Sequence, residues 1–392
     1  MRIIDIRERT IPLSRYADPA IPSGGLTTSL VAVITDVIRA GKPVVGYGFS
    51  SIGRFAQGGL IRERFAPRLL NAVAGALSDE PGTNLDPFRA WNVMMAGEKP
   101  GGHGERCIAV GTLDMAIWDA AAKIAHQPLY RFLAERSGNQ AAAQSRVRAY
   151  AGGGYYYPQN DIMRLRDEIR SFVDLGFTHA KIKIGNADLD QDRRRIDAAA
   201  EQLSAYSHLA VDAMNSYQRD GALAAAQMLA PLGLRWFEDI CDPLDFATQA
   251  EVAAVYPGPI AAGEALFSVA EAKLLDLHGG LRPTQDVLLF DPVHCYGLPG
   301  YLRIIRHLAA NGWPSEAWWP HGGHLFSLHI VAALGLGGAE INPLSFQPFC
   351  GVASDMKIVD GWVDLPQAPG IGFETHHETW GEFRKLSDDG GP

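Results

Sequence analysis

The sequence predicts an α/β protein: a TIM-like parallel (β/α) barrel preceded by an N-terminal α+β domain. The length of 392 residues accommodates a barrel of about 250 residues and leaves room for a second domain. From about Val147, short apolar runs alternate with helical runs, which is the pattern of βα units. Before that point strands come first and helices follow, which is typical of an α+β domain. We place the α+β domain at 1–145, joined by the C-terminal tail at about 362–392, and the barrel at 146–361.

The first domain opens with an antiparallel meander. Ser29–Ile38 is rich in β-branched residues, and a turn containing a glycine leads into a second apolar run at Val44–Phe49. Asp86, which precedes a proline, has the form of a helix N-cap. Gly111–Leu133 carries apolar residues at helical spacing, and its Pro128 predicts a break into two helices.

The second domain contains eight short apolar segments that we predict to be parallel strands, each separated from the next by a plausible helix. Eight such strands over about 200 residues indicate a barrel. The last crossover has the weakest pattern of the series. The predicted strands are Val147–Ala151, His179–Ile184, Leu209–Met214, Arg235–Asp239, Ile260–Gly263, Val287–Asp291, Glu316–Pro320 and Ser345–Phe349.

Composition narrows the classes of partner. The net charge of −9 argues against nucleic acid, because phosphate binding needs clustered Lys and Arg. The four cysteines stand singly, which argues against disulfides and thiolate zinc sites. The charged N-terminus does not resemble a signal peptide, and no apolar run approaches the ~20 residues of a membrane span. We therefore expect a cytoplasmic protein that acts on a small molecule, with no nucleic-acid or membrane partner.

Ionisable residues close six consecutive predicted strands, at intervals of 26 to 30 residues: Lys183, Asp212, Glu238, Glu264, Asp291 and His321. One such residue is more often a helix cap or an ion-pair partner. Six in register with the βα repeat lie at the carboxyl end of the barrel, which is where barrel enzymes do their chemistry.

Three of these residues are carboxylates on consecutive strands: Asp212, Glu238 and Glu264. Carboxylates that converge on one point repel one another unless a cation lies among them. An all-oxygen donor set favours Mg²⁺ over Zn²⁺. The sequence therefore predicts a magnesium site that leaves positions open for a substrate carboxylate.

The remaining residues suit proton transfer. Lys181 and Lys183 share one side of their strand, since side chains alternate along a strand. Desolvation and a cationic neighbour would lower the pKa of one lysine, as a general base requires. Asp291 beside His321 would raise the pKa of that imidazole and make it an acid. A pair of lysines reaching out at the rim is the plainer alternative.

These residues, together with the segment Leu113–Asp119, resemble the enolase superfamily, in its mandelate racemase/muconate lactonizing subgroup. The resemblance spans nearly the whole chain. It implies a capping domain on a (β/α)7β barrel, Mg²⁺, and abstraction of a proton α to a carboxylate. It also implies a homo-oligomer, and loops near Arg15–Thr27 and Phe49–Gly53 that close over the substrate.

Within that subgroup, the segments Glu98–Arg106, Trp318–His324 and Asn342–Phe349 are similar to the branch that dehydrates D-tartrate. This implies dehydration of a hydroxy diacid or acid sugar, most simply D-tartrate to oxaloacetate. Lys183 would be the base, His321 with Asp291 the acid, and Lys181 a substrate contact that neutralises the enediolate. Lys99 would hold a distal carboxylate, and Glu340 would contact the substrate.

Three other functions remain open. A base on each face of the substrate also permits racemisation or epimerisation of an α-hydroxy acid. A barrel without catalysis would not need the full set of Lys, His and carboxylates. A zinc hydrolase would use histidines, and His321, His324 and His329 have suggestive spacing; two glycines after His321 place it in a loop instead.

Overall fold

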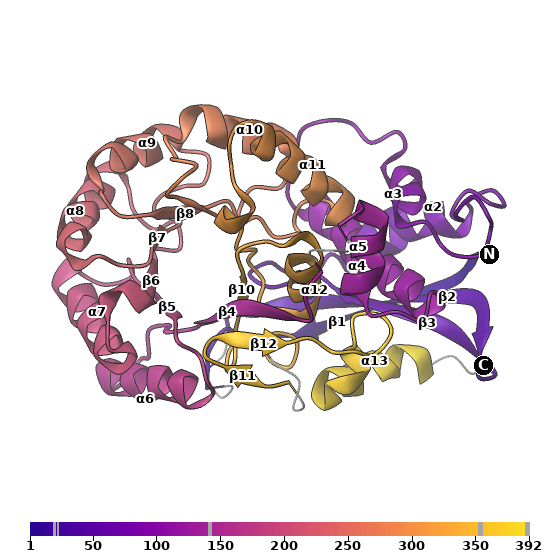
Figure 1. Cartoon of the computed structure of the whole chain (residues 1–392), viewed down its shortest axis with the longest axis horizontal. Coiled ribbons are helices and arrows are strands. Elements are labelled where there is room, and N and C mark those ends of the chain that lie inside the picture. Colours follow the sequence, from indigo (N-terminus) through magenta and orange to yellow (C-terminus); the bar gives the residue numbers. More distant parts are fainter. Residues whose placement is uncertain (19–20, 22, 140–142, 352–355, 389–392) are drawn as a thin grey trace.

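The computed structural model describes residues 1–18, 21, 23–139, 143–351 and 356–388. Figure 1 shows two parts side by side: a ring of helices around short strands, and a smaller unit that contains the N-terminal strands and helix α13. Within the described ranges, no helix combines the length and the apolar character that crossing a membrane would require.

The smaller unit contains the predicted meander. Strands β1 (Ile3–Pro12), β2 (Thr27–Arg39) and β3 (Lys42–Phe49) form an antiparallel sheet in that order. Helix α4 packs on β3 so closely that a Cβ at Gly46 would lie 1.9 Å from the carbonyl oxygen of Ala116. Glycine is therefore the residue that allows this sheet and helix to meet.

Helices α3 and α5 of this unit begin where the sequence predicted, whereas α4 begins at Glu105, before the predicted Gly111. Asp86 caps α3 by accepting hydrogen bonds from the backbone N–H groups of the first turn. Pro128 is the N-cap of α5 and separates it from α4, as expected. The helices are α1 (Gly58–Leu60), α2 (Ala66–Leu70), α3 (Pro87–Met95), α4 (Glu105–Ile124) and α5 (Leu129–Ser137), with a π-helical turn at Ile61–Phe65.

The ring has the α/β architecture that the sequence predicted. Its parallel strands pair in sequence order from β4 to β9, and β10 pairs with β4 on the other side. The strands are β4 (Arg146–Gly152), β5 (Ala180–Lys183), β6 (Leu209–Asp212), β7 (Phe237–Glu238), β8 (Ile260–Ala262), β9 (Val287–Leu288) and β10 (Ala339–Ile341). The helices outside them are α6 (Asp161–Asp174), α7 (Leu189–Leu203), α8 (Arg219–Leu229), α9 (Phe246–Val255), α10 (Val269–His278), α11 (Gly297–Ala310) and α12 (Leu325–Leu334).

Two predicted strands differ from the structure. The eighth strand is β10, so the prediction of Ser345–Phe349 is wrong. That segment contains Pro348, which has no N–H to donate to a ladder, and its Phe346 N–H donates to the Ser14 carbonyl (2.7 Å). In place of the seventh strand, a 3₁₀ turn is followed by a single bridge from Trp318 to β9. In the described part of the chain no strand pairing joins Trp318 to β10, so the sheet is barrel-like without a closed ladder.

The C-terminal segment returns across both parts. β11 (Ile358–Val359) and β12 (Trp362–Asp364) form a hairpin, and β12 pairs antiparallel with β4 of the barrel. The chain then reaches α4, where the Ile371 N–H donates to Asp119 (2.7 Å). Helix α13 (His377–Asp388) lies against β1 and β2. The tail therefore connects the smaller unit to the ring. β12, at the start of the predicted tail, pairs with the barrel sheet rather than with the smaller unit.

Candidate active site

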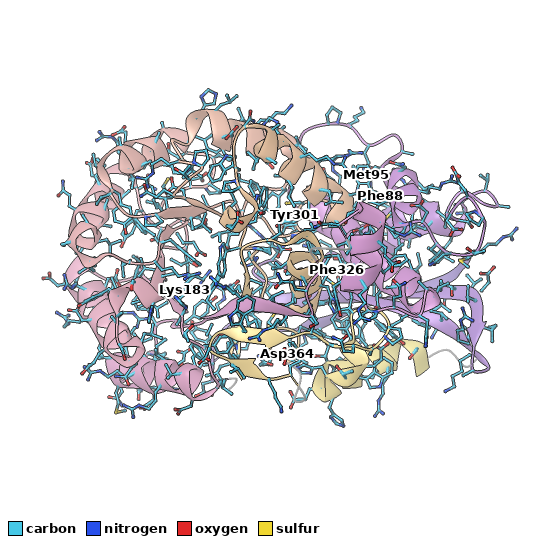
Figure 2. All side chains as sticks on the ribbon, in the orientation of Figure 1. Phe88, Met95, Lys183, Tyr301, Phe326 and Asp364 are labelled. Atoms are coloured by element: carbon cyan, nitrogen blue, oxygen red, sulfur yellow. The ribbon has the colours of Figure 1, made fainter. Side chains whose placement is uncertain are left out.

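A cavity of about 170 Å³ lies at the carboxyl end of the barrel strands. Figure 2 shows Lys183 at the end of β5, inside the ring of helices. Most of the residues predicted for the site line this cavity: Lys183, Asp212, Glu264, His321 and Glu340. The structure thus brings together side chains from strands spread over more than 150 residues of sequence.

The three predicted metal ligands converge. Oxygen atoms of Asp212, Glu238 and Glu264 lie within 4.8 Å of one another. The first two are buried, whereas Glu264 is partly open to the cavity. Trp236 Nε1 donates to Glu238 Oε2 (2.7 Å), which orients the Glu238 carboxylate. Burial, reinforced by repulsion from Asp212 and Glu264, raises the pKa of Glu238 to about 8.

These residues fit a hard divalent cation. The donor set is all oxygen. Four carboxylates, those of Asp212, Glu238, Glu264 and Glu340, face only two ammonium groups in this cluster, those of Lys181 and Lys183. A cation of charge +2 among the three converging oxygens would balance the difference and remove the repulsion that raises the pKa of Glu238.

The two lysines share one side of β5, as the alternation predicted. Lys183 Nζ donates to Asp212 and Lys181 Nζ donates to Glu238; Lys181 Nζ also lies 3.2 Å from Glu340. Burial alone would lower the pKa of Lys183, but the Asp212 carboxylate outweighs burial and raises that pKa. The pKa of Lys181 is raised in the same way, chiefly by Glu238. The prediction of a lowered lysine pKa is therefore wrong, because these carboxylates contact the lysines directly.

His321 and Asp291 form the predicted dyad. His321 Nδ1 lies 3.0 Å from Asp291 Oδ2, which also accepts from Ser51 Oγ (2.6 Å) on the loop after β3. Burial alone would lower the pKa of His321, but Glu264 and the hydrogen bond to Asp291 raise it to about 9. At neutral pH the ring is therefore a cation that can give up a proton.

The last two predicted residues differ in their placement. Glu340 lines the cavity on β10, where it accepts from the Gly322 N–H (3.2 Å) and pairs with Lys181. Lys99 is exposed on the loop before α4 and does not line the cavity. Its carbonyl accepts from Arg106 Nη1 (2.9 Å), which ties this loop to the first turn of α4. The structure thus does not bring Lys99 to the site.

Two arginines from loops of the N-terminal unit also line the cavity, Arg15 and Arg54. The sequence analysis did not identify them. In the described part of the chain neither guanidinium has a carboxylate partner, and Arg54 stacks 5.0 Å from the ring centre of Phe267. Their loops were predicted to cover the site, but a lone arginine in a loop gives no periodic signal. Tyr155 and Asn342 also line the cavity.

Comparison with known proteins agrees with this architecture. The model for the family described as "Enolase C-terminal domain-like" matches residues 164–379. The chain is 28% identical over 290 residues to arabinonate dehydratase of Saccharolobus solfataricus, covering 72% of this chain and 74% of that protein. It is 27% identical over 350 residues to L-talarate/galactarate dehydratase of Salmonella typhimurium, covering 88% and 80%.

The fold is shared with a solved structure of a racemase from Streptomyces coelicolor with bound magnesium. The TM-score is 0.75 at 23% identity, covering 97% of this chain and 99% of that one. The curated relatives are enzymes named as dehydratases and as cycloisomerases, and the family match covers more than half of the sequence. The chain therefore belongs to the enolase superfamily, through the C-terminal domain of the mandelate racemase/muconate lactonizing type.

Proposed function

We propose that this protein is a Mg²⁺-dependent dehydratase of a short hydroxy diacid, with D-tartrate as the substrate and oxaloacetate as the product. One observation carries the proposal: Lys183 at the end of β5 and His321, which is held by Asp291, line the same cavity beside three converging carboxylates. The related dehydratases of acid sugars support the reaction type.

Each step is assigned to a residue of the chain. Lys183 Nζ takes the proton from C2, and Lys181 stabilises the charge that develops on the substrate carboxylate. His321 gives its proton to the C3 hydroxyl as the C3–O bond breaks, so water leaves and an enol forms. The enol then becomes the 2-keto acid. Bound Mg²⁺ would stabilise the developing negative charge. It would also offset the negative charge of Asp212, which otherwise raises the pKa of Lys183 and keeps it protonated.

The cavity favours a small diacid. A volume of about 170 Å³ is below the range of about 300–1,000 Å³ that is usual for drug-sized ligands. Arg15 and Arg54 add two guanidinium groups opposite the carboxylates of the barrel, and guanidinium is well suited to bind a carboxylate. We assign to these arginines the distal-carboxylate contact that was predicted for Lys99.

The alternative is racemisation or epimerisation at C2. His321 and Lys183 line the cavity from separate segments of the chain, so one could remove a proton and the other return it. The likeness to a structure named as a racemase is in keeping with this alternative. A leaving group at C3 of the true substrate separates the two reactions.

The test is turnover with Mg²⁺ on a panel of the tartrate stereoisomers, longer diacids and monoacid sugars, with keto acid measured as the semicarbazone. We expect keto acid from D-tartrate, and we expect Arg54→Met to raise the KM for the diacid by about 10- to 100-fold, which corresponds to one charge-assisted contact. Arg303→Met, on α11, is the matched control. Exchange of the C2 proton for deuterium without any keto acid would establish the racemase alternative instead.

A further inference from the structure

The Asp291 carboxylate lies among three histidine rings, and the proposed reaction uses only one of them. His321 Nδ1 lies 3.0 Å from Oδ2, His294 Nε2 lies 3.7 Å from the same oxygen, and His324 Nε2 lies 3.9 Å from Oδ1. All four side chains are buried. His324 has a structural task, because its Nδ1 accepts from the Ser327 N–H at the start of α12. Among the described residues, His294 caps no helix.

The orientation of His294 leaves a lone pair with nothing to bind. Its Nδ1 lies 3.4 Å from the Glu264 carbonyl oxygen, to which it can only donate. Nε2 then carries the lone pair. That atom is buried and has no hydrogen-bond partner among the described residues, although it faces the Asp291 carboxylate. A lone pair against an anion is repulsive, and a cation between the two atoms would turn the repulsion into attraction.

This arrangement has the form of a metal-binding histidine. Such residues bind through one ring nitrogen and donate the other N–H to a carbonyl or carboxylate, as His294 does toward Glu264. Donor atoms of Asp291, His294 and His321 lie within 4.8 Å of one another. Tetrahedral bonds of about 2.0–2.1 Å place donor atoms roughly 3.3 Å apart, and the contacts of 3.0 Å and 3.7 Å lie on either side of that spacing.

We propose that Asp291, His294 and His321 form a second metal site, which takes a Zn²⁺-type ion. Two imidazoles and one carboxylate suit Zn²⁺ or Co²⁺, whereas Mg²⁺ prefers the all-oxygen set of Asp212, Glu238 and Glu264. Binding at His321 Nδ1 displaces its proton and replaces the hydrogen bond to Asp291. The ion therefore removes the acid of the dehydration, so this is an inhibitory site. The inhibition rests on the proposed function, whereas the binding does not.

The binding test uses Co²⁺ as the probe, added to full-length protein in excess Mg²⁺ and followed by visible absorbance. We expect one bound Co²⁺ with the absorption of a four- or five-coordinate ion. His294→Gln lowers the affinity by at least about 100-fold, which exceeds the loss usual for outer-shell partners. Asp212→Asn, which removes a magnesium ligand, leaves Co²⁺ binding unchanged. His307→Gln controls for binding by surface histidines.

Binding that survives His294→Gln, or that Asp212→Asn abolishes, overturns the second site. Far-ultraviolet circular dichroism and a second variant, His294→Ala, guard against misfolding. The activity arm measures turnover of D-tartrate with rising Zn²⁺ at saturating Mg²⁺. We expect inhibition of the unmodified protein that more Mg²⁺ does not relieve, and resistance in His294→Gln. Co²⁺ binding that depends on His294 but leaves turnover intact supports the site and contradicts the role of His321 as the acid.

Discussion

The two ends of the barrel are built from the same strands and carry opposite chemistry. At the carboxyl end, carboxylates and lysines surround a cavity. At the amino end, Arg235 stacks on the tryptophan rings, 4.8 Å from the ring centre of Trp236 and 4.5 Å from that of Trp319, and His179 and His208 lie ring to ring at 4.7 Å. Between the ends lies a small apolar cluster inside the ring: Tyr150, Ala210, Trp236, Ala261 and Leu289.

In one scaffold, the reactive side chains are thus kept apart from the closely packed aromatic ones. At the amino end, cationic and aromatic side chains pack together beside a cavity that is lined by Arg146, Arg148 and Glu316. The carboxyl end concentrates like charges, which costs stability unless a cation binds there. Trp236 connects the two, because its ring packs in the apolar cluster while its N–H holds Glu238. Four substitutions test this division, and they are ordered from the largest expected effect to the smallest.

Lys183→Met removes the proposed base from the carboxyl end. Turnover should fall by about 1,000-fold or more, since a positioned general base contributes about 10²–10⁴. Steady-state kinetics on D-tartrate measure this loss, and Lys357→Met serves as the control. Turnover close to that of the unmodified protein would mean that another group removes the proton.

Trp236→Phe deletes the indole N–H that links the two ends. It leaves an oxygen of the buried Glu238 without its donor, which should cost about 1.5–3 kcal/mol in the free energy of unfolding. Mg²⁺ affinity should fall by about 10- to 100-fold, as for other outer-shell partners. Urea unfolding and Mg²⁺ titration measure the two effects.

Trp319→Phe is the matched control for that change. The indole of Trp319 donates to the backbone carbonyl of Glu316 (3.0 Å), away from the carboxylates. It should therefore leave Mg²⁺ affinity unchanged. Equal losses of affinity in both tryptophan variants would show that general packing, rather than the contact with Glu238, supports the metal ligands.

His179→Gln tests the amino end. Burial, aided by the charge of Arg235, lowers the pKa of His179 to about 4, below its ordinary value of 6.5. The neutral ring is then fully compatible with folding above pH 6.5. As the pH falls from 6.5 to 4, the unfolded chain takes up the proton first and the folded state loses stability.

Between pH 7 and pH 4, the free energy of unfolding should fall by about 1–2 kcal/mol less in the variant than in the unmodified protein. This amount takes account of the partial exposure of the ring. Urea unfolding at the two pH values measures it, and His278→Gln, at the end of α10, is the control. An identical pH dependence in the variant and the unmodified protein would show that His179 does not contribute.

Lys99→Met should have the smallest effect. Because Lys99 is exposed and lies outside the cavity, kcat/KM for D-tartrate should change by no more than about twofold, as for a surface contact. A rise in KM of tenfold or more would show that the loop before α4 closes over the barrel mouth during turnover, which would restore the earlier role for Lys99.

Much of the candidate site follows from the sequence because it lies on regular elements. Asp212, Glu238 and Glu264 recur with the βα repeat, and parallel strands bring their carboxyl ends to one edge. The alternation of side chains along a strand placed Lys181 and Lys183 on one side. The same reasoning failed at Ser345–Phe349, where apolar character suggested a strand but the segment instead supports the loop that carries Arg15.

What the sequence by itself determined is therefore the α/β fold class, the convergent carboxylates, the lysines of β5 and the dyad, since the βα repeat and the alternation of side chains along a strand encode them. Only the tertiary structure decided that Arg15 and Arg54 line the cavity, that Lys99 does not, and that His294 faces Asp291. Those positions depend on contacts between loops distant in sequence. Such contacts are determined by the packing of the whole molecule, and no repeating pattern of residues predicts them.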